Sequence, residues 1–330
     1  MIVIVLVVFS VLVITFISLL ITKKITFPFI YCVPTGSDFS LGTILTSNPL
    51  SINKAEIQHL DPYQFKCSPP VQFMADPFIV EDKDLYYLFF EQVNRKMFSK
   101  GADIAVIKSK DLINWKHLGV ILREPFHLSY PNVFKWNDKW YMIPETVAKH
   151  EVRLYESTEF PFKWKYITSI IDKMILDPTL FIVNGTLYVL GQSVEDRSLR
   201  LYFSDNLFSG WVEHSSSPIR FGENETQPAG KPGIINGEFT YFVQDHSKGY
   251  GTAVIAYQIE EISKTNFIDK RLKNNPVLSQ FGNEWAECGM HHISWINTNY
   301  EKYFCVVDGV DRIKNKKWKF SIFNFPEFTI

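Results

Sequence analysis

The sequence predicts an all-β protein: a five-bladed β-propeller preceded by one N-terminal transmembrane helix. Three observations favour this fold class. A short pattern recurs five times along the 330 residues, two of its copies contain an Asn-Gly dipeptide between apolar runs, and the first residues are almost wholly apolar. A period of about 40–50 residues with several strands in each unit is typical of propellers.

Each copy of the repeat starts with a polar or aromatic residue, an apolar run and a turn, and continues into a tyrosine-containing or aromatic strand. In the first four copies a proline follows the first residue, and these prolines are 54, 47 and 54 residues apart. Asn184-Gly185 and Asn236-Gly237 are strong hairpin signals, because both turn residues readily adopt positive φ. Strands of this kind cannot bury both faces alone, whereas radially stacked blades can.

The first strand of each copy is predicted to be the innermost strand of a blade, beside the central channel. The residues that enter these strands are Asp76, Tyr130, Asp177, Lys231, and His291 or His292. The following strands end at Glu91, Glu145, Gln192, Asp245 and Asp308. In the first three copies the strand end follows the entry residue by 15 residues. We therefore expect both sets to meet at one mouth of the channel.

Asp76 and Asp177 are the sharpest pair in this set, since both precede proline at the start of an innermost strand. Two carboxylates that face one cavity are what glycoside cleavage requires. An Asp-Pro pair also serves simply to begin a strand, so the two interpretations stay open. If the protein is an enzyme, the predicted catalytic residues are Asp76, Asp177 and Glu145. The predicted substrate-binding residues are Glu91, Tyr130, Lys231, Asp245, His291 and His292.

No metal and no cofactor are predicted. The four cysteines, Cys32, Cys67, Cys288 and Cys305, show no Cys-x-x-Cys spacing that would indicate zinc. Adjacent residues of a strand point to opposite faces, so at most one of the two neighbouring histidines should reach the channel. A disulfide between Cys32 and Cys67 and a set of buried free thiols are both open.

Residues 2–21 form a nearly unbroken apolar run that is long enough to span a bilayer. No small-x-small cleavage site follows it, which favours an uncleaved anchor over residues 1–24 rather than a removed signal peptide. Lys23 and Lys24 would keep the body cytosolic by the positive-inside rule. Two glycosylation sequons, at Asn184 and Asn224, favour the lumen instead.

Residues 25–70 are rich in Pro and Ser and are expected to form a stalk and lead-in, with the propeller over residues 71–330. The lead-in is expected to supply a strand that closes the ring, and residues 320–325 are a candidate last strand, because closure removes exposed sheet edges. The net charge of −1 and the lack of a Lys/Arg stripe give no support to nucleic-acid binding.

The Asp-Pro motifs and the segment from Ser109 to Trp115 resemble the five-bladed family 43 glycoside hydrolases. That resemblance implies that Asp76 is a general base and that Asp177 orients the acid. The acid of that family is a Glu that usually precedes Gly-Pro, whereas this chain reads Ala-Gly-Lys-Pro over residues 229–232, with Glu223 and Glu225 offset. Lys231 is expected to keep a nearby carboxyl ionised, or to hold an anionic group of a glycan.

A closer resemblance covers roughly residues 40–312. Its motifs lie at residues 73–78, 88–91, 127–131, 142–145, 229–232 and 289–292. They look like the N-terminal domain of plant-type glucosamine inositolphosphorylceramide transferases, a family that shares the change at the acid position. The resemblance implies a Golgi membrane protein whose propeller accompanies a separate glycosyltransferase domain, a domain that these residues do not match.

The leading functional hypothesis is a single-pass Golgi or ER protein with a lumenal propeller that recognises a glycan or glycolipid. It would serve as an accessory or binding module in glycoconjugate synthesis, alongside a separate glycosyltransferase. The alternatives are a family-43-like glycoside hydrolase, with Asp76 as base and Glu145 as a relocated acid, and a protein-interaction scaffold. Enzymatic activity is therefore left open.

Overall fold

The computed structural model describes residues 30–34, 39–65, 71–94, 101–282, 285–298, 302–311, 316–320 and 328–329. These residues form two compact units. The larger unit spans residues 37–94 and 99–312, and the smaller one includes the described strands at both ends of the chain.

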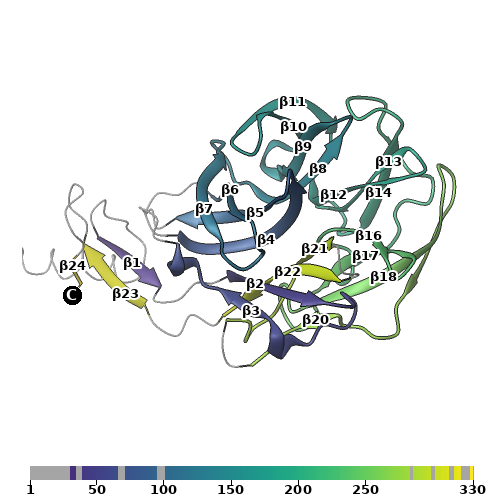
Figure 1. Ribbon diagram of the computed structural model, residues 1–330. Helices are drawn as coiled ribbons and strands as arrows, with labels where there is room; N and C mark the ends of the chain where they lie inside the picture. Colours follow the sequence, from purple (N-terminus) through teal and green to yellow (C-terminus); the bar gives the residue numbers. More distant parts are fainter. Residues whose placement is uncertain are drawn as a thin grey trace, which may run out of the picture. The chain divides into compact units, whose positions relative to one another are not determined.

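The larger unit is a ring of five antiparallel sheets, which confirms the predicted five-bladed propeller (Figure 1). Blade one contains β4 (Val71–Asp82), β5 (Leu85–Asn94), β6 (Asp103–Ser109) and β7 (Lys116–Leu122). Blade two contains β8 (Ser129–Trp136), β9 (Lys139–Glu145), β10 (Val152–Glu159) and β11 (Lys163–Ile171). Blade three contains β12 (Ile175–Val183), β13 (Thr186–Ser193), β14 (Leu199–Ser204) and β15 (Val212–Glu213).

Blade four contains β16 (Gly233–Ile235), β17 (Glu238–Asp245), β18 (Ala253–Ile262) and β19 (Phe267–Arg271), and β20 (Leu278–Ser279) also pairs with β18. Blade five joins the two ends of the ring, in the strand order β21 (Ile293–Asn297), β22 (Tyr303–Val310), β2 (Phe39–Thr46) and β3 (Gln58–Leu60). The expected lead-in thus supplies two strands to the ring, and the expected propeller boundary at residue 71 lies after them.

The smaller unit contains a three-stranded antiparallel sheet of β1 (Ile30–Pro34), β23 (Lys316–Phe320) and β24 (Phe328–Thr329). Phe320 is the one described residue of the candidate last strand over residues 320–325, and it pairs with Ile30 in this sheet and not in a blade. Residues 321–325 lie outside the described part. The closing partner of β22 is β2, with which it pairs along eight residues.

The helical elements of the described residues are three short 3₁₀ turns: η1 (Lys54–Glu56), η2 (Pro62–Gln64) and η3 (Val147–Lys149). Within the residues that the structure describes, no helix is long and apolar enough to cross a membrane. The predicted anchor over residues 1–24 lies outside the described residues, as does Cys67. Cys288 and Cys305 carry free thiols.

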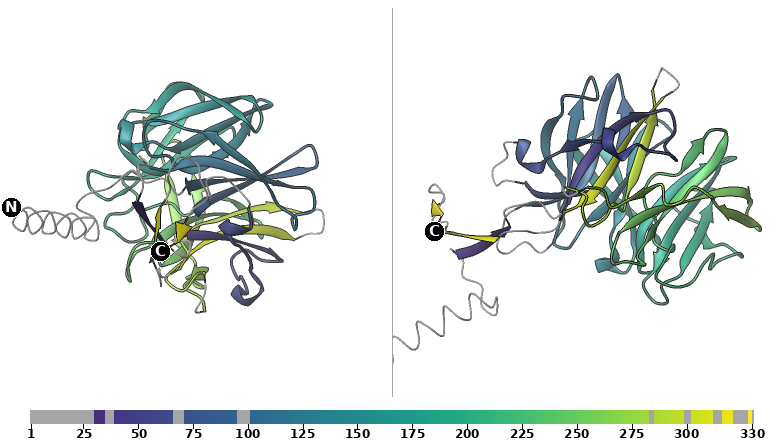
Figure 2. Two further views of the ribbon diagram at one scale, coloured as in Figure 1. Left: turned by 90° about the vertical axis from the view of Figure 1, so that its left-hand side faces the viewer. Right: turned by 90° about the horizontal axis from the view of Figure 1, so that it is seen from below.

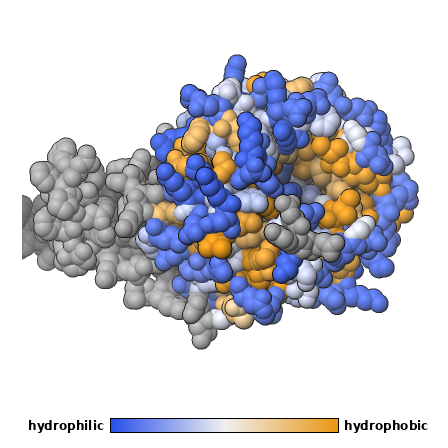
Figure 3. Space-filling view, viewed as in Figure 1, coloured by the Kyte–Doolittle hydropathy of each residue, from blue (hydrophilic) through white to orange (hydrophobic). Residues whose placement is uncertain are grey.

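The core lies between neighbouring blades. Five hydrophobic clusters can be traced among the described residues, and each one joins two adjacent blades. Phe89 of blade one packs in one cluster with Met142 of blade two, for example, and Leu190 of blade three packs with Val243 of blade four. Figure 2 shows the blades from two further directions, and Figure 3 shows hydrophilic residues over much of one face with hydrophobic areas between them.

The innermost strands of the first three blades share a backbone irregularity at the repeat's entry residue. Asp76, Tyr130 and Asp177 all have positive φ, at 51°, 46° and 50°, and each lies at a break in the pairing with the next strand. A β-bulge of this kind redirects a side chain that regular alternation would place elsewhere. The entry residue of the repeat in these three blades is therefore the residue at the bulge.

Candidate functional site

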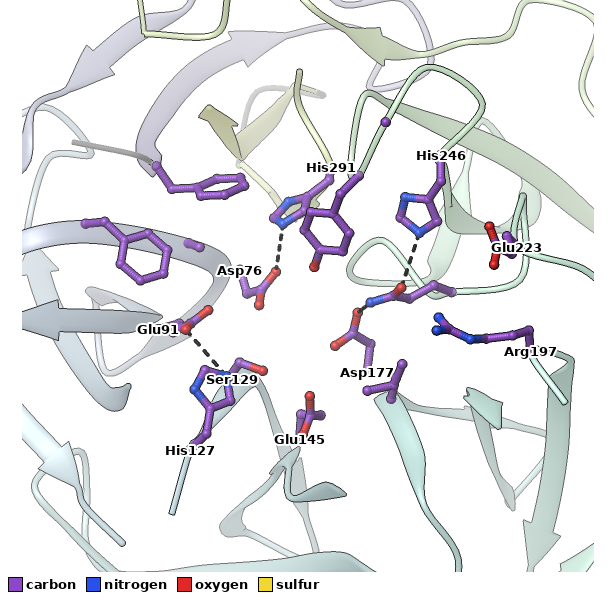
Figure 4. A pocket seen from close by; sticks show the side chains of 17 residues that line it. Asp76, Glu91, His127, Ser129, Glu145, Asp177, Arg197, Glu223, His246 and His291 are labelled. Atoms are coloured by element: carbon purple, nitrogen blue, oxygen red, sulfur yellow. Dashed lines mark hydrogen bonds and ion pairs between the residues drawn. The ribbon is translucent and has the colours of Figure 1, made fainter. Parts of the chain in front are cut away.

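The five blades surround a pocket of about 630 Å³. Its lining comes from every blade and is rich in carboxyl groups, imidazoles and aromatic rings (Figure 4). The carboxyl groups are Asp76, Glu91, Glu145, Asp177 and Glu223. The imidazoles are His127, His246 and His291, and the aromatic rings are Phe39, Phe73 and Tyr250. In Figure 4 the side chains of Asp76, Glu91, Glu145 and Asp177 point toward a common centre.

The register of the inner hairpins positions these carboxyl groups. Ala75 pairs with Glu91, and Ser129 pairs with Glu145, so each strand end lies level with the bulge of the neighbouring strand. The constant spacing of 15 residues in the sequence is this register. It places Asp76 and Glu91 of blade one at the same depth, with both side chains nearly buried.

Asp76 lies among imidazoles. Its Oδ1 is 3.5 Å from His292 Nδ1 and 4.0 Å from His291 Nε2. Burial by itself would raise the pKa of Asp76, but the hydrogen bond with His292 and the positive charge of His291 outweigh it, so the pKa is below its usual value. Asp76 therefore stays ionised at neutral pH despite its burial.

His291 is paired on its other side with Asp308. Its Nδ1 lies 2.7 Å from Asp308 Oδ2, and both side chains are buried. Burial would lower the pKa of His291, but the charges of Asp308 and Asp76 reverse this and raise it to about 9. The ring therefore carries a positive charge at neutral pH, between two carboxylates.

Three of the pocket's carboxyl groups, Glu91, Glu145 and Asp177, have raised pKa values. Burial and the neighbouring charges of Asp76 and Glu145 raise the pKa of Glu91 well above its usual range, although His127 Nε2 lies 3.6 Å away. Burial also raises the pKa of Glu145 to about 7, despite a hydrogen bond of 3.0 Å from the Val147 backbone N–H. The pocket thus combines ionised and protonated carboxyl groups at neutral pH.

Asp177 lies among amides. Its Oδ2 accepts hydrogen bonds from Gln227 Nε2 at 2.7 Å and Gln244 Nε2 at 3.1 Å. Gln227 in turn contacts His246, whose Nε2 lies 3.2 Å from its Oε1. Burial and the negative charge of Asp76 raise the pKa of Asp177 well above its usual range, and the Gln227 hydrogen bond only partly offsets this.

Asp76, His291 and Asp308 are the one described group of three ligand-bearing side chains whose donor atoms lie within 4.8 Å of one another. Both oxygens of Asp308 already accept backbone N–H groups, from Asp76 and His291. A cation would have to displace these contacts, so the donor set gives no reason to assign a metal here.

Five of the nine predicted site residues line the pocket: Asp76, Glu91, Glu145, Asp177 and His291. His292 does not line it but reaches Asp76 from the buried side. Only His291 of the two lines the pocket, in line with the expectation that at most one would reach the channel, although both precede β21 and neither lies in a strand. Alternation applies only within extended strands.

Tyr130 and Lys231 are not part of the pocket lining, contrary to their predicted binding roles. Tyr130 is fully buried, and its hydroxyl contacts Thr179 Oγ1 at 2.7 Å and accepts a hydrogen bond from the Gly230 N–H at 2.8 Å. Lys231 donates from Nζ to the Trp295 carbonyl at 3.0 Å. Both side chains tie neighbouring blades together, and Lys231 is not placed to hold an anion in the pocket.

Asp245 is also outside the lining. Its carboxylate accepts hydrogen bonds from the backbone and hydroxyl of Ser247, and so shapes the loop after β17. The preceding residue, Gln244, is fully buried and reaches Asp177 instead.

Several lining residues were not identified from the sequence: Phe39, Arg197, Gln227, His246 and Tyr250. They lie in β2 or in loops between strands, where the repeat has no fixed length. Glu223, which the sequence placed out of position for an acid, also lines the pocket, and its side chain is exposed. The two glycines of the 246–251 loop, Gly249 and Gly251, were a signal in the sequence: both have positive φ, and Gly251 packs against His291.

The fold and the pocket together define the class of protein: a five-bladed propeller with a carboxylate-rich pocket at its centre. Residues 63–310 match the family described as glucosamine inositolphosphorylceramide transferase 1, N-terminal. The chain therefore belongs to that family, as its motifs suggested.

The chain is similar to curated glucosamine inositolphosphorylceramide transferases 1 of two plants. The protein of Oryza sativa subsp. japonica is 28% identical over 327 residues, which cover 91% of this chain and 44% of that protein. The protein of Arabidopsis thaliana is 29% identical over 254 residues, which cover 74% of this chain and 33% of that protein. The chain thus spans less than half the length of these relatives.

Solved structures of glycoside-cleaving proteins share the fold. The catalytic domain of a GH62 α-L-arabinofuranosidase from Coprinopsis cinerea has a TM-score of 0.55 at 13% identity, covering 85% of this chain and 90% of that one. An exo-1,5-α-L-arabinanase from a bovine ruminal metagenomic library has a TM-score of 0.53 at 15% identity, covering 81% and 99%. At these identities the likeness concerns the fold alone.

Proposed function

We propose that the propeller binds a glycan in its central pocket. The observation that carries the proposal is the mixed protonation of its buried carboxyl groups: Asp76 is ionised while Glu91 and Asp177 have raised pKa values. A sugar hydroxyl both donates and accepts hydrogen bonds, and this pocket offers acceptors and donors side by side. The rings of Phe39, Phe73 and Tyr250 add apolar surface for the C–H face of a sugar.

The ligand that fits this pocket is uncharged where it meets the carboxyl groups. Lys231, which was expected to hold a uronate or phosphate, contacts the Trp295 carbonyl instead. An anion beside the ionised Asp76 would face like charge in a buried site, which is costly. We therefore replace the anionic ligand suggested by the sequence with a neutral glycan.

The family supplies the biological context of the proposal. The relatives are named for transfer of glucosamine to inositolphosphorylceramide, and this chain spans 44% of the rice protein. We propose that the chain is an accessory or recognition module in glycolipid or polysaccharide synthesis. On this proposal a separate glycosyltransferase carries out the transfer, and the propeller binds the donor's or acceptor's glycan.

A glycan array with the full chain tests the proposal. We expect selective binding of neutral glycans, weakened about 10- to 100-fold by Asp76→Asn, which removes a charge-assisted hydrogen bond of roughly 1–3 kcal/mol. Asp245→Asn is the matched control, because Asp245 ends an equivalent strand but lies outside the pocket lining. Binding that is unselective, or equally weakened by both variants, would count against the proposal.

A second candidate is a glycoside hydrolase, favoured by one specific observation. The pKa of Asp76 is lowered while that of Glu145 is raised to about 7, which is how paired carboxyl groups divide into base and acid. Turnover of a neutral glycoside that is lost in both Asp76→Asn and Glu145→Gln would favour this candidate. Binding without turnover would favour the recognition module.

We further propose that residues 1–24 anchor the protein in the ER or Golgi membrane with the propeller in the lumen. Asn184 and Asn224 are both exposed, as acceptors of N-linked glycans must be. We expect a mobility shift on enzymatic removal of N-glycans that is lost in the Asn184→Gln, Asn224→Gln double variant. Digestion of the propeller by protease added to intact microsomes would place it in the cytosol and end this proposal.

A further inference from the structure

Asp308 does not line the pocket, yet three groups of the site contact its carboxylate. Its Oδ2 accepts a hydrogen bond of 3.0 Å from the Asp76 backbone N–H and lies 2.7 Å from His291 Nδ1. Its Oδ1 accepts a hydrogen bond of 3.1 Å from the His291 backbone N–H. The side chain is 0% exposed, so water cannot substitute for these partners.

We propose that Asp308 is a positioning residue, which holds the charged His291 ring with Nε2 toward Asp76 and holds the Asp76 backbone at its bulge. Asp76 and Asp308 thus lie on opposite edges of one ring. The expected effect of Asp308 on glycan binding rests on the proposed function. Its effect on the orientation of the His291 ring does not depend on that function.

The repeat aligns Asp308 with Glu91 and Glu145, but its side chain is shorter than theirs. Glu91 lies three residues before the end of β5 and Glu145 ends β9, and both reach into the pocket. Asp308 lies two residues before the end of β22 and has one methylene group fewer. Its carboxylate therefore stays beside the backbone and the first ring it meets, and acts on the pocket through His291.

The remaining contacts of His291 restrict the ring to this plane. Phe39 stacks on it at a centroid distance of 4.7 Å, and Tyr250 meets it edge-on at 5.6 Å. A Cβ atom at Gly251 would lie 2.7 Å from the ring, so the 246–251 loop packs tightly against it. Phe39, Tyr250 and Gly251 carry no charge. Their contacts fix the plane of the His291 ring, whereas the charge of Asp308 determines which edge of the ring faces Asp76.

The test uses the full chain and the variant Asp308→Asn, with Asp245→Asn as control. The variant keeps an oxygen for one backbone N–H but loses the negative charge beside His291. ¹⁵N NMR of the histidine rings at pH 8 is expected to show both nitrogens of His291 protonated in the wild type and in the control, and a neutral ring in Asp308→Asn. Glycan binding at pH 8 is expected to weaken about tenfold, as for loss of one charge-assisted contact.

An unchanged His291 spectrum in Asp308→Asn would overturn the proposal. If the variant does not fold, the wild-type spectrum decides: a His291 Nδ1 without a proton at pH 8 would equally overturn it. If no glycan binds to any form of the protein, the proposed function fails, while the ring spectra still decide the role of Asp308. A binding loss that is the same at pH 5 and pH 8 would indicate a merely structural role.

Discussion

The Asp76 and Asp177 ends of the pocket start from the same sequence motif and the same backbone. Both residues precede proline, both have a φ near 50°, and both lie at a bulge in an innermost strand. Their surroundings differ: Asp76 meets the imidazoles of His291 and His292, whereas Asp177 meets the amides of Gln227 and Gln244. The pKa of the first is lowered and that of the second is raised.

The repeat determines the backbone around Asp76 and Asp177 but not the chemistry of their surroundings. The repeat determines where the innermost strand bulges, since the bulge recurs in the first three copies. The neighbouring blade determines the chemistry, because the partners of Asp76 come from blade five and those of Asp177 come from blade four. An identical pair of motifs can therefore supply an ionised and a protonated carboxyl group within one cavity.

The largest effect is expected for Asp76→Asn. At pH 7 this change leaves the buried His291 cation facing Asp308 alone, and removal of one partner from a buried ion pair costs about 3 kcal/mol. Chemical denaturation at pH 7 measures the loss. Because the pKa of Asp76 is lowered, its contribution is present above the usual Asp pKa and is lost as the pH falls through the lowered value, so the two proteins should converge in acid.

The comparison would break if Asp76→Asn and Asp177→Asn changed the free energy of unfolding equally at pH 7. Equal losses would mean that the backbone bulge, and not the charged neighbours, decides what each carboxyl group contributes.

Glu145 provides an intermediate case, since its pKa of about 7 lies within an easily measured range. A carboxyl group whose pKa is raised in the folded state contributes stability below its unfolded pKa and loses it as the pH rises through the folded value. We therefore expect Glu145→Gln to gain about 1–3 kcal/mol relative to the wild type between pH 5 and pH 8. Denaturant unfolding at both pH values measures the gain.

Glu81→Gln is the control for this experiment, because Glu81 is exposed and lies outside the pocket lining. A constant difference between Glu145→Gln and the wild type from pH 5 to pH 8 would contradict the raised pKa of Glu145.

The sequence was sufficient for the ring of five blades and for four pocket carboxyl groups, because both follow from a repeat with constant spacing. The prediction of site residues from the sequence failed where the spacing of the repeat changes. In blade four the residue of positive φ is Gly230, and Lys231 follows it, so the entry position predicted from proline is displaced. Asp245 ends β17 as the repeat predicts, but its carboxylate accepts hydrogen bonds from Ser247 and lies outside the pocket lining.

The partners that distinguish Asp76 from Asp177 could be predicted only in part. The two adjacent histidines were visible as a pair, but not their approach to one carboxylate, which depends on their lying before β21. Gln227, His246 and Tyr250 lie in the connections around β16 and β17, and no periodic pattern marks the residues of a loop. Their roles depend on long-range packing between blades, which a repeat within one blade does not encode.

The smallest effect is expected for Asp177→Asn. A carboxyl group with a raised pKa is largely neutral, and an Asn oxygen can accept both hydrogen bonds that Gln227 and Gln244 now donate to Oδ2. The change should therefore shift the free energy of unfolding by less than about 1 kcal/mol near pH 5, and should favour the variant as the pH rises toward the raised pKa.

Chemical denaturation at pH 5 and pH 9 tests the small shift and its dependence on pH. Gln227→Ala is the control, because it removes the hydrogen bond between Gln227 and Asp177 from the other side. A loss of several kcal/mol in Asp177→Asn at pH 5 would show that Asp177 is ionised like Asp76, and that amides and imidazoles serve the two ends alike.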